Sequence, residues 1–410
     1  MPWQRCLVPM RSRYSLDLLH TIRPIHTIKP IRQTVIIAEL ANDPSIQQGI
    51  PPSMKYRAAI RQGARIIRNG GLVGFPTETV YGLGADATNA SAVDKIYRVK
   101  GRPREDPLIV HLGSVDDLAG IADDESHIMD TALELAGIYW PGALTMILSR
   151  KEGAVASEVS AGRNTVAVRM PDHPVALALI RAAGVPIAAP SANRFGHISP
   201  TTGEHVISDL GNEIDMLIDT GHTRIGVEST VVDLTASAPT VLRPGGVTIE
   251  ELRRTCPSLT YTPKQAGGSS SSPGNYLRHY SPHTPLVIVD DLDVDAGNRS
   301  STHVTEVMSE LVGSLSARGL SSTVIATFPE QEDDLRNLAN NLYSYLHTAD
   351  AGKGDIILAG FVRDQGIGTA INDRLFRAAA GRVVRDASPT TVDFIVDLVS
   401  PHRIELDPTD

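Results

Sequence analysis

Residues 100–112 read KGRPREDPLIVHL. The apolar second half, residues 107–112, is typical of a short buried strand. The first half places Lys100 and Arg102 two positions apart in a segment broken by glycine and proline, where we expect extended backbone that directs both side chains to one side. Because arginine offers a planar fork and lysine a compact charge, this pair predicts a clamp for a polyanion. A solvated basic surface is the alternative from spacing alone.

Two other polar segments follow apolar stretches of strand type. PTETVYGLG at residues 76–84 displays hydroxyls and backbone amides between glycines, where a ligand could approach closely. The tripeptide Ser191-Ala192-Asn193 follows the strand predicted over residues 186–190. Loops at the ends of strands are common ligand sites in α/β sheets. By spacing alone, both segments are also compatible with simple polar turns.

Short strands and helices alternate through the first part of the chain, which predicts an α/β layer with some antiparallel pairing. The predicted strands cover residues 34–39, 71–76, 107–112, 143–149, 165–170, 186–190, 214–219, 228–234 and 240–243. The predicted helices cover residues 54–69, 90–99, 128–137 and 174–183.

A cleaner alternation begins at Leu286. Strands are predicted over 286–289, 322–327 and 355–359, and helices over 303–317, 333–346 and 369–379. Three successive strand–helix units predict a small parallel sheet with right-handed crossovers. The preceding residues 257–285 are rich in glycine and serine and then in aromatic and basic residues, which is typical of a flexible linker whose end docks on the protein.

Length and charge bound the domain organisation. A chain of 410 residues exceeds one core, so we expect a tail at 1–33, a first domain at 34–256, the linker at 257–285 and a second domain at 286–410. The formal net charge is −9, and residues 286–410 hold 20 acidic and 10 basic residues, which disfavours a nucleic-acid surface there. The only cysteines, Cys6 and Cys256, cannot build a disulfide framework or a cysteine zinc site.

The location of the protein is predicted from its first residues and its hydropathy. No apolar run approaches the roughly 18 residues of a membrane span, so we expect a cytoplasmic protein without membrane association. Residues 1–33 hold five arginines, Lys29 and one acidic residue, Asp17, a composition that can act as a mitochondrial presequence. A disordered tail or an over-long gene model explains the same composition, and the two interpretations stay open.

Seven motifs occur in the order and spacing of the YrdC/Sua5 family, which the sequence resembles over about residues 34 to 400. They are GGLVGFPTETVYGLGADA (70–87), KGRPREDPLIVHL (100–112), YWPGALT (139–145), TVAVRMPDHPVA (165–176), PIAAPSANRFGHISPT (186–201), GVESTVVDLT (226–235) and VLRPGGVT (241–248). The resemblance implies an α/β fold with a YrdC-like twisted mixed sheet and helices, plus a smaller C-terminal Rossmann-like parallel α/β domain.

The resemblance to two-domain Sua5-type members also implies an activity. It is that of a nucleotidyltransferase, L-threonylcarbamoyladenylate synthase, which converts L-threonine, bicarbonate and ATP to threonylcarbamoyl-AMP and pyrophosphate. This is the first step towards threonylcarbamoyladenosine at position 37 of tRNAs that read ANN codons. A threonylcarbamoyl transferase is the implied downstream partner, and Mg²⁺ is expected to arrive with ATP rather than at a protein metal site.

The residues that the resemblance assigns to the site lie near predicted strand ends or in the linker. They are Lys100 and Arg102 for catalysis and ATP, Asn193 and Arg243 for ATP, Thr77, Arg169, Ser191 and Ser229 for threonine, and Arg278 and Tyr280 for a lid, with Tyr81 and His111 as neighbours. No side chain stands out as a covalent nucleophile, so positioning and electrostatics should supply most of the rate enhancement. No Walker loop or G-x-G-x-x-G helix start is present, so ATP should occupy a different kind of site.

The linker departs from the family pattern. Where the family reads approximately P-G-M-K-Y, this chain has Asn275, Tyr276 and Leu277 after its proline and glycine. A one-residue shift in an extended segment turns the aromatic ring to the opposite side. We therefore expect Tyr276 to lose the family tyrosine's contact, while Arg278 and Tyr280 keep their register.

Two other classes of protein are alternatives. A double-stranded RNA- or tRNA-binding module without synthase activity is disfavoured as the main role by the overall acidity and by the lack of aromatics along a basic stripe, although weak tRNA binding stays compatible. A maturation factor of the HypF kind also carries a YrdC-like domain. It would need zinc-binding cysteine pairs, which two isolated cysteines cannot supply.

Overall fold

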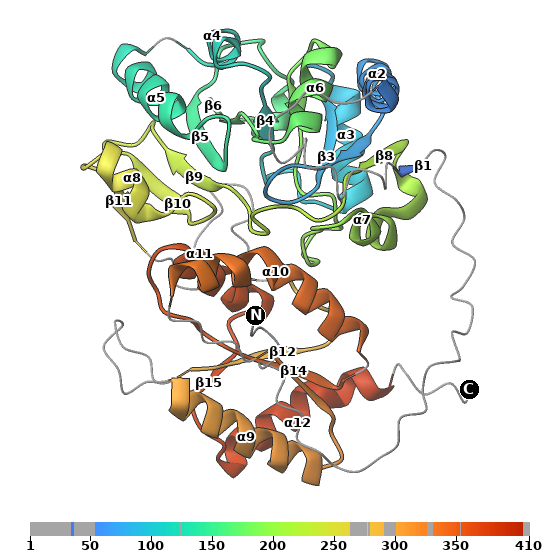
Figure 1. Ribbon diagram of the computed structural model, residues 1–410, viewed down its shortest axis with the longest axis vertical. Coiled ribbons are helices and arrows are strands. Elements are labelled where there is room, and N and C mark those ends of the chain that lie inside the picture. Colours follow the sequence, from blue (N-terminus) through green and yellow to red (C-terminus); the bar gives the residue numbers. More distant parts are fainter. Residues whose placement is uncertain are drawn as a thin grey trace.

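The computed structural model of the protein contains two α/β bodies joined in one chain (Figure 1). It describes residues 34–36, 54–123, 125–262, 277, 279–290, 301–325, 331–352 and 354–404. The predictions for the N-terminal tail, Tyr276 and Arg278 lie outside the described residues. No helix in the described ranges is long and apolar enough to cross a membrane.

The larger body is built on a mixed sheet, which contains eleven strands among the described residues. In sheet order these are β1 (Thr34–Ile36), β8 (Met216–Asp219), β2 (Val73–Phe75), β3 (Gly82–Asp86), β7 (Ile187–Ala188), β4 (Ile109–His111), β6 (Thr165–Arg169), β5 (Leu144–Ser149), β9 (Thr230–Asp233), β10 (Thr240–Arg243) and β11 (Thr260–Tyr261). Parallel pairs such as β4–β6 and β5–β9 occur beside antiparallel pairs such as β3–β7 and β5–β6. The predicted mixed α/β sheet is confirmed.

The helices of the larger body pack in separate apolar clusters. The first cluster includes side chains of α3 (Ala90–Lys100), α4 (Leu118–Ile121), α5 (Ser126–Tyr139), α7 (Gly203–Leu210) and α8 (Ile249–Thr255), and the second includes those of α2 (Met54–Arg68) and α6 (Pro174–Ala183). Short 3-10 turns lie at Val115–Asp117, Ser157–Ser160 and Gly211–Glu213. Burial of the sheet between these clusters explains why strand β3 is buried along its full length.

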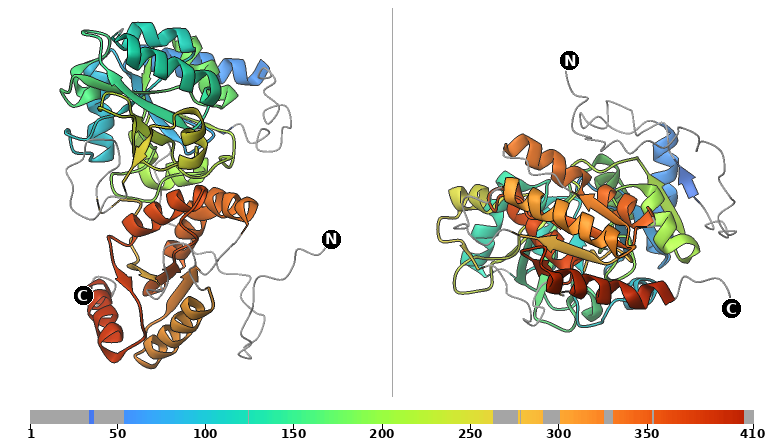
Figure 2. Two further views of the ribbon diagram at one scale, coloured as in Figure 1. Left: turned by 90° about the vertical axis from the view of Figure 1, so that its left-hand side faces the viewer. Right: turned by 90° about the horizontal axis from the view of Figure 1, so that it is seen from below.

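The smaller body has a parallel sheet, as three strand–helix units predict. Among the described residues its order is β13 (Ser322–Ile325), β14 (Ile356–Gly360), β12 (Leu286–Val289) and β15 (Val383–Val384), and all neighbours are parallel. One cluster holds α9 (Ser301–Ala317) and α12 (Pro389–Ile404), and another holds α10 (Glu332–Ala351) and α11 (Ile367–Ala378). Figures 1 and 2 show α10 and α11 on the side of the small sheet that faces the larger body.

The two bodies share an apolar core. Val80, Ile198 and Val227 of the larger body belong to the same buried cluster as Leu342 of α10 and Ile371 of α11. All five side chains are buried. Because burial of apolar area is the main favourable term in folding, this shared cluster holds the two bodies together in a fixed arrangement.

The structure corrects two local predictions. Lys100 is the last residue of α3 and Gly101 ends this helix in a left-handed conformation with φ 62°, so the predicted extended backbone from Lys100 to Arg102 is wrong. A glycine immediately after a helix commonly adopts this conformation, because it carries no Cβ. In addition, Thr260 and Tyr261 extend the large sheet past the boundary that we expected at residue 256.

A glycine at the contact between the two bodies provides a test of this packing. A Cβ at Gly226 would lie 2.3 Å from the carbonyl oxygen of Asn340, and Gly226 has φ +79°. Gly226→Ala should therefore add a clash to the cost of an L residue at positive φ. We expect a melting temperature below that of Gly319→Ala, whose φ is +73° but whose Cβ would meet nothing within 4 Å. The clash should add roughly 1–3 kcal/mol, or about 2–10 °C. Equal shifts in the two variants would contradict the packing.

Candidate active site

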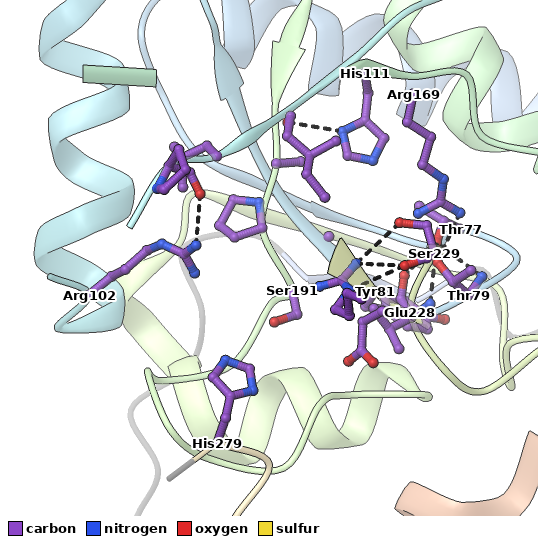
Figure 3. Close-up of a pocket in the computed structure, with 18 of the residues that line it drawn as sticks. Thr77, Thr79, Tyr81, Arg102, His111, Arg169, Ser191, Glu228, Ser229 and His279 are labelled. Carbon is purple, nitrogen blue, oxygen red and sulfur yellow. Dashed lines mark hydrogen bonds between the residues drawn. The ribbon is translucent and has the colours of Figure 1, made fainter. Parts of the chain in front are cut away.

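One pocket lies over strand β4 and gathers groups from distant parts of the sequence (Figure 3). The lining residues are Thr77, Thr79, Val80, Tyr81, Gly82, Arg102, Pro107, Leu108, Ile109, His111, Arg169, Ala189, Pro190, Ser191, Glu228, Ser229, Arg243, His279 and Tyr280. Of the predicted site residues in the described ranges, only Lys100 and Asn193 are absent from this lining.

Strand register explains why distant residues meet here. His111 and Arg169 are paired in the parallel strands β4 and β6, so they lie side by side at the ends of these strands. Ile109 is two positions before His111 and lines the same pocket, as expected for alternate residues of one strand. Ser191 reaches the pocket because it forms an antiparallel bridge with Gly82.

Arg169 is buried at one end of the pocket. Its Nη2 atom donates hydrogen bonds to Glu78 Oε1 at 2.6 Å and to Thr79 Oγ1 at 2.9 Å. Its Nε atom donates to the Gly142 carbonyl at 3.1 Å. These bonds fix the plane of the guanidinium group. Arginine binds carboxylates through this planar group, often with two parallel hydrogen bonds. The second carboxylate oxygen of Glu78 is buried and has no hydrogen-bond partner among the described residues.

The polar turn before β3 displays hydroxyl groups, as its sequence predicts. The Thr77 hydroxyl donates to the Val80 carbonyl at 2.6 Å and lies 2.8 Å from Thr79 Oγ1. Tyr81 also lines the pocket, and its hydroxyl donates to Asp219 Oδ1 at 2.6 Å. The turn therefore brings two threonine hydroxyls and Tyr81 to the pocket.

Ser229 and Arg243 form a second polar wall. Arg243 Nη2 donates to the Ser229 carbonyl at 2.8 Å and lies 3.2 Å from Ser229 Oγ. The Ser229 hydroxyl is also 2.8 Å from Thr145 Oγ1. Arg243 ends β10 and Ser229 immediately precedes β9, and these two strands are antiparallel neighbours. The structure thus places Ser229, which was predicted to bind the substrate threonine, beside Arg243, which was predicted to bind ATP.

Arg102 lines the far end of the pocket and is held by its own loop. Its Nη2 atom lies 2.9 Å from Asp106 Oδ2 and donates to the Pro107 carbonyl at 2.8 Å. Its Nε atom donates to the Asp106 carbonyl at 3.0 Å. These bonds hold the guanidinium group of Arg102 in one orientation at the pocket, and a fixed guanidinium group suits an anionic ligand.

Lys100 and Asn193 lie behind the pocket wall. The Lys100 Nζ atom donates to the Ser191 carbonyl at 2.5 Å and also to the Asn193 carbonyl. The Asn193 amide donates to the His197 carbonyl at 2.8 Å. Burial lowers the pKa of Lys100 well below its usual value, and the charge of Arg102 lowers it further. In this arrangement the lysine supports the loop that carries Ser191.

Two histidines at the pocket are held neutral. Burial, with a smaller contribution from Arg169, lowers the pKa of His111 to about 3. Burial also lowers the pKa of His279 well below its usual value, and the charges of Arg102 and Lys100 act in the same direction. The Nδ1 atom of His279 and the hydroxyl of Tyr280 are buried without a hydrogen-bond partner among the described residues. The end of the linker therefore brings polar groups to the pocket that a ligand could engage.

No role was predicted from the sequence for Glu228 or for the side chains that hold it, Arg374 and Tyr343. Glu228 lines the pocket, and its carboxylate accepts hydrogen bonds from Arg374 and Tyr343 of the smaller body. A signal was present in α11, because Arg374 follows Ile367, Ala370 and Ile371 on the stripe of buried positions that a helix directs to the core. An arginine on an apolar stripe indicates a buried partner.

Metal-binding side chains do not cluster in the described part of the chain. No group of three or more His, Cys, Asp or Glu residues there could hold a metal ion. Cys256, the described cysteine, is buried and makes no disulfide.

Two sequence families match consecutive parts of the chain. The family Sua5_yciO_yrdC, described as "Telomere recombination", matches residues 65–245. The family described as "Threonylcarbamoyl-AMP synthase, C-terminal domain" matches residues 247–380.

Whole proteins are similar over most of their length. The threonylcarbamoyl-AMP synthase of Bacillus subtilis is 42% identical over 340 residues, which are 80% of this chain and 94% of that protein. The threonylcarbamoyl-AMP synthase of Pyrococcus abyssi is 40% identical over 336 residues, 80% of this chain and 95% of that protein. The crystal structure of P. abyssi Sua5 complexed with L-threonine matches with a TM-score of 0.73 and 39% identity, over 80% of this chain and 95% of that one.

The buried histidines predict a pH dependence of stability. Burial lowers the pKa of His111 to about 3 and that of His173 to about 4, below the ordinary value of about 6.5. Between these values the unfolded chain binds more protons than the folded one, so the free energy of unfolding falls as the pH decreases from 6.5 towards 4. Each such histidine should contribute up to about 1.4 kcal/mol per pH unit. Urea unfolding at several pH values measures this slope.

A matched pair of variants assigns the slope. His111→Asn should make it shallower, because the neutral buried imidazole is gone, whereas His127→Asn on the exposed surface of α5 should leave it as in the wild type. An unchanged slope in His111→Asn would show that this histidine does not titrate as proposed.

Proposed function

The chain belongs to the Sua5/YrdC family and carries both of its domains, and from this premise we propose that it is a threonylcarbamoyl-AMP synthase. It would join L-threonine, bicarbonate and ATP into L-threonylcarbamoyladenylate and release pyrophosphate, as a step towards the modified adenosine at position 37 of tRNA. The observation that carries this proposal is the pocket lined by Arg102, Arg169 and Arg243 together with small hydroxyls, in a chain that matches a threonine-bound Sua5 over most of its length.

The chemistry of this reaction explains the composition of the pocket. The amine of threonine first attacks the carbon of bicarbonate, a C–O bond breaks, and one water and one proton are released, which gives an N-carboxy-threonine with two negative charges. A carbamate oxygen then attacks the α-phosphorus of ATP, the bond from this phosphorus to the bridging oxygen breaks, and pyrophosphate leaves. Both partners are anionic, so buried cations lower the barrier by bringing them together and offsetting the charge on the leaving group. A site with little water also protects the labile carbamate.

We assign the threonine side of the pocket to the end near Arg169. Its guanidinium group is positioned by Glu78 and Thr79, and would receive the α-carboxylate of threonine. The hydroxyls of Thr77, Ser191 and Ser229 line the same pocket and could bind the remaining polar groups of the substrate. This assignment agrees with the roles that the family resemblance implies.

We assign the nucleotide side to Arg102 and Arg243, with the lid residues above it. Arg102 would bind phosphate oxygens directly. Lys100 would contribute through the Ser191 loop, or reach the phosphates only by leaving the carbonyl oxygens that it now contacts. His279 and Tyr280 line the pocket from the linker, so they fit a lid that excludes water, and Arg278 remains a lid prediction outside the described residues.

Magnesium and partners are further parts of the proposal. The pocket carboxylate Glu228 is already bound by Arg374 and Tyr343, so Mg²⁺ that arrives with ATP would be held mainly by phosphates and water. We propose a threonylcarbamoyl transferase as the acceptor of the product. The role of an RNA-binding module without synthase activity is not favoured, because the similar proteins of matching length are synthases. Cytoplasmic location and mitochondrial targeting by residues 1–33 stay predictions.

The direct test is pyrophosphate release by the full-length protein. With ATP and Mg²⁺ present, release should require both L-threonine and bicarbonate, and threonylcarbamoyl-AMP should form in equal amount. Reactions that lack threonine, or that contain serine in its place, are the controls. Release at the same rate without threonine would refute the proposed activity.

The assignment of Arg169 predicts which substrate a variant loses. Arg169→Lys keeps the charge but loses the planar fork, so the KM for threonine should rise about tenfold and that for ATP should change less. Arg224→Lys is a matched control, because this arginine pairs with Asp172 on the exposed surface outside the pocket. Equal increases in both KM values of Arg169→Lys would place Arg169 elsewhere in the mechanism.

A further inference from the structure

Glu228 lines the pocket, and its carboxylate is held in place by the other domain. Tyr343 of α10 donates its hydroxyl hydrogen bond to Glu228 Oε2 at 2.8 Å, and the Nε atom of Arg374 in α11 donates to the same oxygen at 2.7 Å. Ser199 donates to Oε1 at 2.7 Å. Glu228 is only 6% exposed. A buried carboxylate at the substrate pocket is therefore fixed by two side chains from the C-terminal domain.

Arg374 does more than neutralise this charge. Its side chain is 0% exposed, and its three nitrogen atoms have different acceptors. Nε binds Glu228, Nη2 donates to the Pro244 carbonyl at 3.0 Å, and Nη1 donates to Asp373 Oδ2 at 2.6 Å. Only a rigid, forked group can make these bonds together, and lysine has neither the geometry nor the reach.

The two acceptors in the larger body are neighbours of the polar wall. Glu228 precedes Ser229, and Pro244 follows Arg243. The segments also bind each other, because the Gly246 amide donates to the Glu228 carbonyl at 3.0 Å. One guanidinium group thus fixes both strand ends from which Ser229 and Arg243 enter the pocket.

The same arginine contacts the end of the linker. The Cζ atom of Arg374 lies 5.2 Å from the ring centroid of Tyr280, and the Tyr280 ring stacks on Tyr343 with centroids 5.6 Å apart. Tyr280 lines the pocket and holds a positive φ of 61°, a conformation that surrounding contacts must maintain. The position of this lid residue therefore depends on the same pair of side chains from the C-terminal domain.

We propose that Arg374 is a positioning residue for the synthase reaction: through Glu228 and Pro244 it sets Ser229 and Arg243, and through its contact with Tyr280 it sets the lid. This inference rests on the proposed synthase function. It makes the catalytic pocket complete only while the C-terminal domain is docked. A purely stabilising role fits less well, because a buried ion pair is often no more stabilising than an apolar pair of similar size.

The central experiment compares Arg374→Lys with Asn340→Ala in the full-length protein. Asn340 also joins the two bodies, since its amide donates to the Thr223 carbonyl at 2.7 Å. Neither Asn340 nor Thr223 lines the pocket. Arg374→Lys keeps a positive charge but loses the forked hydrogen bonds to Glu228 and Pro244. Because hydrogen bonds to charged groups are strong, this loss should lower kcat about tenfold or more. Asn340→Ala should keep kcat within about threefold of wild type. Melting temperatures show that each variant is folded.

A second variant and a second measurement keep the test decisive if Arg374→Lys does not fold. Tyr343→Phe keeps the ring that stacks on Tyr280 and removes only the bond to Glu228, so kcat should fall while the chain stays folded. Hydrogen exchange of the peptide that contains Tyr280 should be faster in Arg374→Lys and unchanged in Asn340→Ala. This measurement does not depend on the reaction.

The outcomes separate this inference from the proposed function. A wild-type protein that makes no threonylcarbamoyl-AMP would refute the function itself. An active wild type, with Arg374→Lys and Tyr343→Phe both at wild-type kcat and with unchanged exchange at Tyr280, would overturn the positioning role. Equal losses in Arg374→Lys and Asn340→Ala would also overturn it, because a loosened interface would then be sufficient.

Discussion

A negative charge buried between two domains is the constraint on which much of this structure depends. Burial alone would raise the pKa of Glu228, but the charges of Arg374 and Arg243 outweigh it and hold the pKa below the ordinary value. An unpaired carboxylate in this place would be costly. Glu228 of the larger body and Arg374 of the smaller body therefore pair each other's buried charge. This ion pair lies beside the pocket, at the contact between the two domains.

The rest of the site follows from the mixed sheet. Parallel pairing of β4 with β6 places His111 beside Arg169, while antiparallel pairing of β9 with β10 brings Arg243 to Ser229. Both arrangements leave the arginines buried and bonded to backbone or to fixed side chains. Because these cations are already oriented before a ligand binds, little reorganisation energy would be spent during the reaction.

Much of the fold and of the pocket lining could be predicted from the sequence, because ordered motifs and hydrophobic periodicity identify strands and the loops between them. The conformation at Lys100 could not, since the helix continues through Lys100 and ends only at the left-handed Gly101, whereas we expected Lys100 in an extended segment. The roles of Tyr343 and Arg374 depend on their contacts with Glu228, which lies more than one hundred positions earlier in the sequence. Local patterns contain no such partner, although an arginine on a buried helical stripe was a visible signal.

The apolar core shared by the two bodies has a consequence for shorter forms of the chain. Val80, Ile198 and Val227 are covered by α10 and α11 in the complete protein. A fragment that ended after β11 would lack the helices that cover these side chains, and exposed apolar surface promotes self-association. During synthesis on the ribosome the same surface is uncovered until most of the chain has emerged, so the growing polypeptide passes through an interval in which it is vulnerable to aggregation.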